Sequence, residues 1–194
     1  MHVKPIVTLL EANEIVYAVG GSLLLYLKGL PVSPNDMDIL VEPEQFARAK
    51  RTLQNMAVIS EDKLPQDRFQ TKSCTTFTMS DGLQVDLMAG FAVSYGGNVL
   101  EMPFTAVRNQ TIAGVLPLSS MEAWYIMYWL LPGKEGKRSV MEQYFRSSGL
   151  KDRHYLQQAL EFELPEGASA AIQDLLTYEE TELNLSQNKF IATT

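Results

Sequence analysis

Cysteine and histidine are scarce in this chain, which holds one cysteine and two histidines among 194 residues. The single Cys74 excludes a disulfide within the chain and a zinc site built on several cysteines. His2 and His154 lie too far apart in the sequence to suggest a paired histidine site. This sparing use of cysteine fits a reducing compartment, and we expect a cytoplasmic protein.

Long hydrophobic runs and an excess of positive charge are missing too. The longest apolar run, Met121 to Leu131, contains a glutamate and is about half the roughly 20 residues needed to cross a bilayer, so it predicts a buried helix. The first residues show no basic start before an apolar core, so no secretory signal is expected. The 16 Lys and Arg against 23 Asp and Glu give a net charge of -7, which disfavours a long nucleic acid as partner.

Hydrophobic residues make up 46% of the chain, enough for the core of one domain or of one domain with a small appendage. Up to about residue 116, helical patterns alternate with β-rich ones. The expected elements there are a helix over 5–14, a strand over 15–19, a short helix capped by Ser22 after Gly20-Gly21, a strand over 37–42 and a helix over 43–56.

From about residue 119 the patterns are helical, over 119–131, 136–149, 151–163 and 168–180. We therefore expect an α+β fold with an α/β core over residues 1–116 and a C-terminal helical region over 117–180 packed on it. Residues 181–194 carry no clear signal and are expected to form a loosely ordered tail.

A β-hairpin is indicated by Asp81-Gly82, which stands between two β-rich runs. The two runs should therefore be antiparallel neighbours in a sheet. A strict two-residue turn would place Asp86 opposite Phe77 on the same face. Either the loop is longer, or that face mixes a carboxylate with an apolar ring.

Two aspartates one residue apart, Asp36 and Asp38, would project from the same face of their strand. Two carboxylates about 5 Å apart repel each other by roughly 3 kcal/mol at an effective dielectric near 20. Such a pair needs a proton, a cation or open solvent. A divalent metal is one solution, and a solvated strand end or turn is the other.

Asp86 lies on a second β-rich segment, between the apolar Val85 and Leu87, which should face the other way. If that strand neighbours the first, Asp86 adds a third oxygen ligand. Hard oxygen ligands suit Mg²⁺ or Mn²⁺.

The order of these features resembles the nucleotidyltransferase superfamily that shares the DNA polymerase beta palm. A strand leads to Gly20-Gly21-Ser22 and a helix, then to a strand with Asp36 and Asp38, and later to a strand with Asp86. The resemblance covers roughly residues 15–90, and is greatest to small stand-alone bacterial members such as lincosamide nucleotidyltransferases and abortive-infection toxins. It implies a palm-like mixed sheet flanked by helices.

By this resemblance, Asp36, Asp38 and Asp86 hold the catalytic Mg²⁺ or Mn²⁺ ions, and Gly20, Gly21 and Ser22 approach the phosphates of a nucleoside triphosphate. The triphosphate also needs fixed positive charge. The basic candidates for nucleotide binding are Arg68, Lys72, Lys134, Lys137 and Arg138. Each one taken singly is better explained as a solvated surface charge, and together they are the expected source of positive charge.

The chain departs from the family where the C-terminal helices begin. Tyr128 stands where the family often has a lysine, and Lys137-Arg138 stands where a lysine-aspartate pair is expected. Triphosphate binding and the acceptor are therefore left open. The aromatic residues of this segment predict core packing or an interface, with base stacking as the lesser alternative.

The resemblance thus implies an enzyme that moves a nucleoside monophosphate from a nucleoside triphosphate to a hydroxyl of an acceptor, which is a small molecule, a protein or a tRNA end. The alternative is a non-catalytic protein of the same fold that binds or regulates a partner, such as a toxin-antitoxin component. A protein partner and a homodimer both stay open, and no membrane association is expected.

Overall fold

The computed structural model of the chain describes residues 3–191; in its last helix, the side chains of residue 180 and of residues 182–191 lie outside the described part. The helices are α1 (Val3–Ala12), α2 (Gly21–Leu27), α3 (Pro43–Gln54), α4 (Met121–Leu130), α5 (Glu135–Ser148), α6 (Arg153–Ala159) and α7 (Ala168–Ile191). The strands are β1 (Tyr17–Val19), β2 (Asp36–Val41), β3 (Ala57–Lys63), β4 (Ser73–Met79), β5 (Gln84–Ala89), β6 (Ala92–Tyr95), β7 (Asn98–Glu101), β8 (Val107–Thr111) and β9 (Gly114–Leu118).

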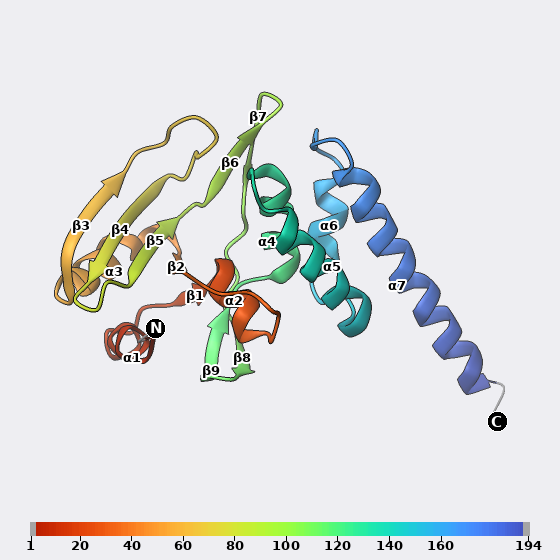
Figure 1. Ribbon diagram of the computed structural model, residues 1–194, viewed down its shortest axis with the longest axis horizontal. Coiled ribbons are helices and arrows are strands. Elements are labelled where there is room, and N and C mark those ends of the chain that lie inside the picture. Colours follow the sequence, from red (N-terminus) through yellow and green to blue (C-terminus); the bar gives the residue numbers. More distant parts are fainter. Residues whose placement is uncertain (1–2, 192–194) are drawn as a thin grey trace.

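A mixed sheet of seven strands, in the order β3-β4-β5-β2-β1-β9-β8, forms one part of the molecule, and helices α4 to α7 form the other (Figure 1). Strand β2 runs parallel to β5 and β1 runs parallel to β9, whereas the other neighbours are antiparallel. Strands β6 and β7 form a separate hairpin. The expected α+β fold, a mixed sheet flanked by helices, is confirmed.

Alternation along the central strands gives the sheet two different faces. Met37, Ile39, Val85 and Leu87 are fully buried on the face covered by α3, as their spacing predicted. Phe77 of β4 lies opposite Val85 and is also fully buried there. The other face therefore carries the polar residues of β2 and β5, which are Asp36, Asp38, Gln84 and Asp86.

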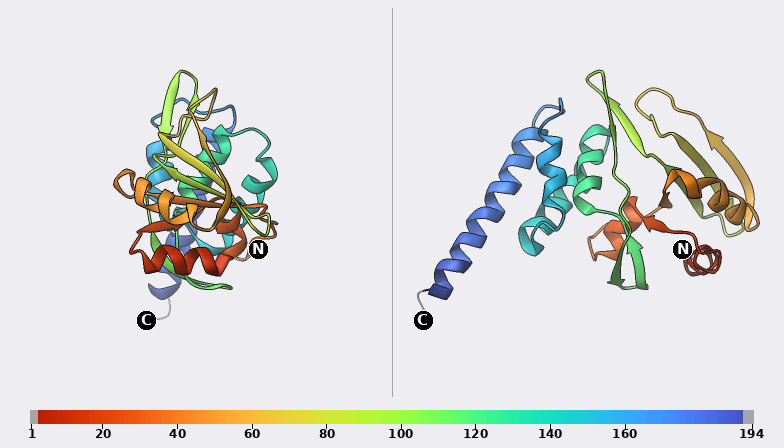
Figure 2. Two further views of the ribbon diagram at one scale, coloured as in Figure 1. Left: turned by 90° about the vertical axis from the view of Figure 1, so that its left-hand side faces the viewer. Right: turned by 180° about the vertical axis from the view of Figure 1, so that it is seen from behind.

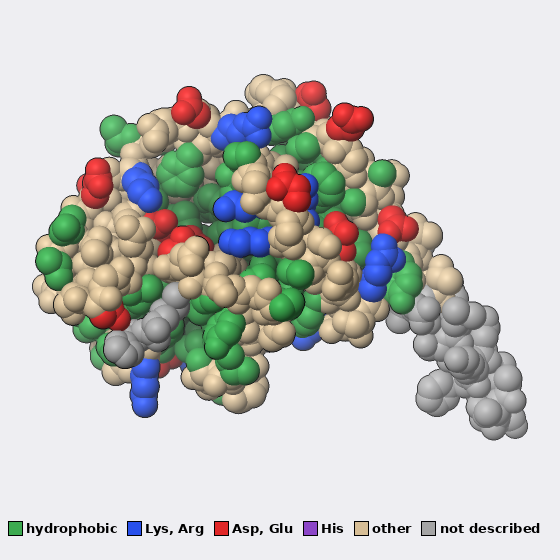
Figure 3. Space-filling model, in the orientation of Figure 1, with side chains coloured by type: hydrophobic (Ala, Val, Ile, Leu, Met, Phe, Trp, Pro, Cys, Tyr) green, Lys and Arg blue, Asp and Glu red, His purple; other side chains and the backbone are tan. Residues whose placement is uncertain are grey.

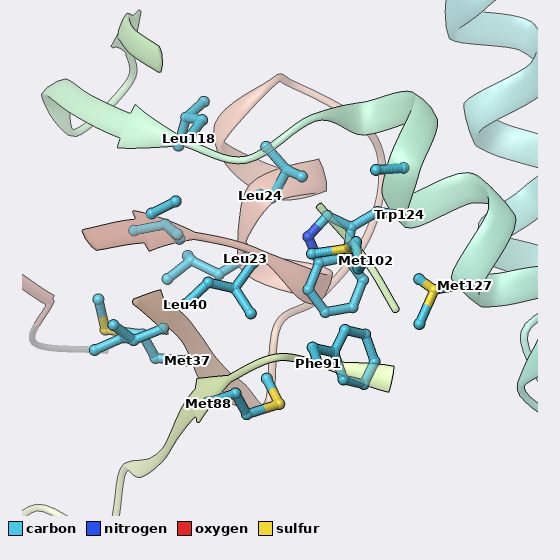
Figure 4. Packing of buried hydrophobic residues seen from close by; sticks show 14 of the residues in the cluster. Leu23, Leu24, Met37, Leu40, Met88, Phe91, Met102, Leu118, Trp124 and Met127 are labelled. Atoms are coloured by element: carbon cyan, nitrogen blue, oxygen red, sulfur yellow. The ribbon is translucent and has the colours of Figure 1, made fainter. Parts of the chain in front are cut away.

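The core continues from the sheet into the helical part through α4 (Figure 4). Trp124 of α4 stacks on Phe91 with ring centroids 5.2 Å apart, and Met102 packs beside them. All residues of α4 except Trp129 are buried, because α2, α5 and α6 surround this helix. The aromatic segment therefore serves core packing, the first of the two alternatives given by the sequence.

The hairpin predicted at Asp81-Gly82 is present, and its loop is longer than two residues. The backbone N–H of Met79 donates to the carbonyl of Leu83 at 2.9 Å, which closes a three-residue loop over 80–82. The extra residue shifts the register, so that Thr76 and not Phe77 lies opposite Asp86. The polar face is thus kept free of the Phe77 ring.

Several elements had no clear signal in the sequence. Strand β3 lies at a sheet edge and six of its seven side chains are exposed, and β8, at the other edge, is largely polar, so neither shows the pattern of a buried strand. Helix α7 runs on through residues 181–191, where no element was expected, and residues 192–194 lie outside the described part (Figure 2). Among the described residues, no helix combines the length and apolar character that a membrane span requires.

Truncating the buried ring in Phe77→Ala should lower the free energy of unfolding by about 3–5 kcal/mol, because a large cavity would open between the sheet and α3. Val58→Ala, at a side chain that is 67% exposed on the edge strand, should change it by less than about 0.5 kcal/mol. Urea denaturation monitored by circular dichroism measures both. Equal losses for the two variants would contradict the assignment of the core.

Candidate active site

The three acidic residues singled out by the sequence lie on the polar face of two adjacent strands. Asp38 of β2 is directly opposite Asp86 of β5 in a parallel pairing, and Asp36 is opposite Gln84 two residues earlier. Each carboxylate is only partly exposed. Figure 3 shows a hollow near the middle of this view, with acidic side chains on one side and basic side chains on the other.

Ser22 belongs to this group, although in a different role from the one predicted. Helix α2 begins at Gly21, and its N-terminal capping residue is Gly20, so no side chain caps the helix. The expected cap by Ser22 is wrong. Its buried hydroxyl lies in the first turn of the helix and donates to Oδ1 of Asp36 at 3.2 Å. Ser22 thus fixes the orientation of the first carboxylate.

The two glycines are required by contacts inside the protein. Gly21 has φ +58°, and a Cβ there would lie 1.7 Å from Oδ2 of Asp38. A Cβ on Gly20 would lie 2.4 Å from the indole ring of Trp124. The turn therefore lets one carboxylate and one aromatic ring of α4 approach the backbone. Whether it also admits a phosphate stays a prediction.

The surroundings of Asp38 disfavour its charged form. Burial, followed by the neighbouring carboxylates of Asp36 and Asp86, raises its pKa to about 7. Lys137 and Lys134 lower the pKa, but less than burial raises it. No hydrogen bond or ion pair to the Asp38 carboxylate occurs within the part of the chain that the structure describes. Its negative charge thus lacks a direct partner.

Asp86 is held by two residues that sequence reasoning did not single out. The hydroxyl of Thr76, its cross-strand neighbour, donates to Oδ1 of Asp86. The ammonium of Lys63, the last residue of β3, lies 3.3 Å from the same oxygen. Neither partner was predicted, because both depend on the three-residue loop that sets the β4–β5 register.

The three acids are not arranged closely enough to hold one metal ion together. Among the residues whose side chains the structure describes, no three His, Cys, Asp or Glu side chains are positioned to hold one ion together. The donor chemistry nevertheless fits a divalent cation, because Asp36 and Asp38 supply hard oxygen ligands and Asp38 lacks a counter-charge. Asp86 would have to turn from Thr76 and Lys63 to join them.

Two lysines of the α4–α5 region face the acids. Burial and the nearby Lys134 lower the pKa of Lys137, while Asp36 and Asp38 act in the opposite direction. The ammonium of Lys137 lies 5.3 Å from the ring centroid of Tyr128. The Tyr128 hydroxyl is buried without a hydrogen-bond partner, and burial together with Asp38 and Asp36 raises its pKa. Lys137 thus lies close enough to Asp38 for its positive charge to lower the pKa of that carboxyl group.

The other basic candidates are engaged in contacts within the protein. Arg138 lies 4.0 Å from the Trp129 ring centroid and donates to the carbonyl of Tyr128 at 3.0 Å. Arg68 donates to the carbonyl of Leu130 at 3.3 Å, and Lys72 pairs with Glu101 at 2.7 Å. Their role as nucleotide ligands stays a prediction, and of the basic candidates Lys137 and Lys134 are the ones that act on the charge of Asp38.

A cavity of about 540 Å³ opens beside Asp86, between the end of β3, the loop that follows it, and β5. Phe69, Cys74 and Met88 give it an apolar wall, and Lys63 and Asp86 give it charge. Its size and mixed lining suit a compact amphipathic molecule that reaches Asp86.

The raised pKa of Asp38 predicts a pH-dependent stability. Because its folded-state pKa of about 7 exceeds the ordinary 3.8, ionisation destabilises the folded state increasingly as pH rises from about 4 to 7. Asp38→Asn should therefore gain stability over the wild type across this range, by at most about 4 kcal/mol, and keep that gain above pH 7.

Urea denaturation with a chelator present, from pH 5 to 8, measures the effect. Asp62→Asn is the control of opposite sign, because hydrogen bonds from Lys50 and Thr75 lower the pKa of Asp62. The stability difference between Asp62→Asn and the wild type should stay constant in this range. The same constancy for Asp38→Asn would contradict the electrostatic account.

Gly21→Ala should cost about 2 kcal/mol or more, because it combines a left-handed backbone with a collision against Asp38. Gly97→Ala is the matched control, with φ +80° and no atom within 4 Å of the added Cβ. Adding Asp38→Ala should recover part of the loss at Gly21 and none at Gly97. Chemical denaturation of the single and double variants measures the coupling, and independent effects at positions 21 and 38 would contradict the contact.

The fold of the chain is similar to the folds of several solved structures. No family model and no curated protein matches the sequence. The fold matches TM1012 of Thermotoga maritima, a protein assigned as a nucleotidyltransferase, with TM-score 0.57 and 19% identity over 75% of this chain and 91% of that one. It also matches the lincosamide antibiotic adenylyltransferase LnuA in its lincomycin-bound form, with TM-score 0.51 and 12% identity over 72% and 94% of the two chains.

A third match is the antibiotic-resistance factor ANT(2'')-Ia, with TM-score 0.51 and 11% identity over 97% of this chain and 95% of that one. At such low identities the likeness concerns the fold. The chain therefore has the nucleotidyltransferase fold.

Proposed function

We propose that the protein is a divalent-metal-dependent nucleotidyltransferase that moves a nucleoside monophosphate from a nucleoside triphosphate to a hydroxyl of a compact acceptor. The observation that carries this proposal is the group Asp36, Asp38 and Asp86 on one face of β2 and β5, with the charge of Asp38 lacking a direct partner. A buried acid of this kind, beside two others and facing lysines, is typical of a functional site.

Asp36 and Asp38 would hold the metal, with Asp86 completing the set. A bound divalent ion would neutralise these carboxylates and stabilise the developing charge on phosphate oxygens. Lys137 and Lys134 supply fixed positive charge from the opposite side, where the triphosphate tail would lie. The protein thereby offers negative groups for cations and positive groups for phosphates within one hollow.

In the reaction, the acceptor hydroxyl oxygen forms a bond to the α-phosphorus, and the bond from that phosphorus to the β-phosphate oxygen breaks to release pyrophosphate. Asp86 takes the hydroxyl proton, because it borders the cavity through which an acceptor can reach it. Thr76 orients this carboxylate through its hydroxyl.

A small-molecule acceptor is favoured over a long nucleic acid. The net charge of -7 opposes non-specific binding to a phosphate backbone. The cavity beside Asp86 holds about 540 Å³, a volume suited to a compact molecule. The similar protein LnuA is named as a lincosamide antibiotic adenylyltransferase, and we extend from it only the idea of a small hydroxyl-bearing acceptor.

A non-catalytic binding or regulatory protein is the second candidate. Two observations favour it: the three carboxylates are not placed to hold one ion together, and Asp86 is bound by Lys63. In that case the acids would be partnered by groups of another molecule instead of metal and nucleotide.

Thermal melting with Mg²⁺ and each nucleoside triphosphate in turn separates the two candidates. A ligand at 100 times its dissociation constant adds about 2.7 kcal/mol to stability, so one triphosphate should raise the melting temperature of the wild type clearly. Asp36→Asn/Asp38→Asn should lose this increase, since the ligands of the metal are gone, and so should the wild type with chelator.

Glu44→Gln, an exposed acid on α3 at the opposite face of the sheet, is the matched control and should retain the full increase. Pyrophosphate release with the stabilising triphosphate and a panel of hydroxyl compounds would then identify the acceptor. No metal-dependent increase for any triphosphate, with correctly folded protein, would favour the non-catalytic candidate.

A further inference from the structure

Lys63 forms an ion pair with Asp86. It is the last residue of the edge strand β3, and its Nζ lies 3.3 Å from Oδ1 of Asp86. The side chain of Lys63 is 45% exposed and that of Asp86 is 22% exposed. The ammonium is therefore accessible to solvent and in contact with the carboxylate that the proposed reaction needs.

The strand pairing explains how Lys63 reaches this acid. Thr76, Asp86 and Asp38 form one row across β4, β5 and β2 on the polar face. Lys63 belongs to the adjacent row, opposite Cys74, which in turn is opposite Met88. Its position thus sets the lysine beside an apolar wall of the cavity, with the ammonium directed toward Asp86.

This ion pair is suited to exchange. Ion pairs with this degree of exposure contribute little to stability, so another charged group can replace either partner at small cost. Oδ1 of Asp86 cannot receive a cationic ligand there while Lys63 occupies the same approach. Anything that draws the ammonium away leaves the Asp86 carboxylate with the Thr76 hydroxyl as its remaining partner among the described residues.

We propose that Lys63 selects the acceptor, and that the acceptor class is a compact hydroxyl compound with a phosphate or carboxylate group beside the reacting hydroxyl. The anionic group pairs with the Lys63 ammonium, which leaves Asp86. The hydroxyl then lies next to the freed carboxylate. The inference rests on the proposed function for its reaction, whereas the anion site itself is independent of catalysis.

The other charges around the cavity support this choice. Asp62 is neutralised by Lys50, whose Nζ lies 2.5 Å from Oδ1, and it accepts a hydrogen bond from the Thr75 hydroxyl at 2.6 Å. Glu61 is the remaining acid of the lining and is exposed at the edge strand. A cationic acceptor would have to pair with Glu61, and the positive charge of Lys63 would repel it unless Lys63 moved away.

Ligand-observed NMR tests the site without turnover or metal. The probes are glycerol 3-phosphate, glycerol and 3-amino-1,2-propanediol, which share a hydroxylated chain and differ in charge. The wild type should bind them in that order of decreasing affinity. Lys63→Met should bind glycerol 3-phosphate roughly tenfold more weakly, because a charged hydrogen-bond donor is lost. Lys50→Met, at the lysine that pairs with Asp62, should bind it like the wild type.

Electron paramagnetic resonance of Mn²⁺ supplies a second readout. Since Lys63 competes for Asp86, Lys63→Met should bind Mn²⁺ roughly two- to fivefold more tightly than the wild type, and Lys50→Met should not. Unchanged Mn²⁺ affinity in Lys63→Met would overturn the competition between lysine and metal.

Equal binding of glycerol 3-phosphate by the wild type and Lys63→Met would overturn the anion site, as would tighter binding of the aminodiol or no saturable binding by the wild type. These failures differ from a failure of the proposed function. That failure would appear as the absence of metal-dependent stabilisation by any triphosphate, whatever the phosphate probe does.

Discussion

The burial of the Asp38 carboxylate beside two other carboxylates on one sheet face is the constraint to which the rest of the site responds. Asp38 lies directly opposite Asp86 and two residues from Asp36, and burial raises its pKa to about 7. Ser22 relieves Asp36, and Thr76 with Lys63 relieves Asp86, whereas Asp38 has only distant lysines. A proton or a bound cation would remove the cost of this charge, and we propose that the cation links the sheet to function.

The architecture concentrates the charge by bringing distant segments to one point. The parallel pairing of β2 and β5 aligns two acids, and the left-handed Gly21 lets the Asp38 carboxylate lie against the backbone at the start of α2. Trp124 packs on Gly20 and fixes α4 to the same turn. Helix α4 then leads into the segment that directs Lys134 and Lys137 toward the acids. The acids and the lysines that act on Asp38 thus come from different halves of the chain.

Local patterns were sufficient to predict the elements that carry the acids. Alternation placed Asp36 and Asp38 on one face of their strand and Met37 and Ile39 on the other, buried face. The Asp81-Gly82 signal identified the β4–β5 hairpin. The partners of Asp86 could not be predicted, because they depend on one extra loop residue and on an edge strand without a buried pattern. The cap by Ser22 failed because its hydroxyl bonds to Asp36, a tertiary contact that outweighs local capping preference.

The proposed function depends most on a cation bound at the Asp38 carboxylate. The most direct measurement is a crystal structure of the protein grown with Mn²⁺ and a non-hydrolysable nucleoside triphosphate, with anomalous diffraction recorded to locate the metal. The account predicts anomalous density in contact with the carboxylates of Asp36 and Asp38 and with the phosphates, with Asp86 turned toward it. Density confined to other sites, or none beside ordered Asp36 and Asp38 carboxylates, would contradict it.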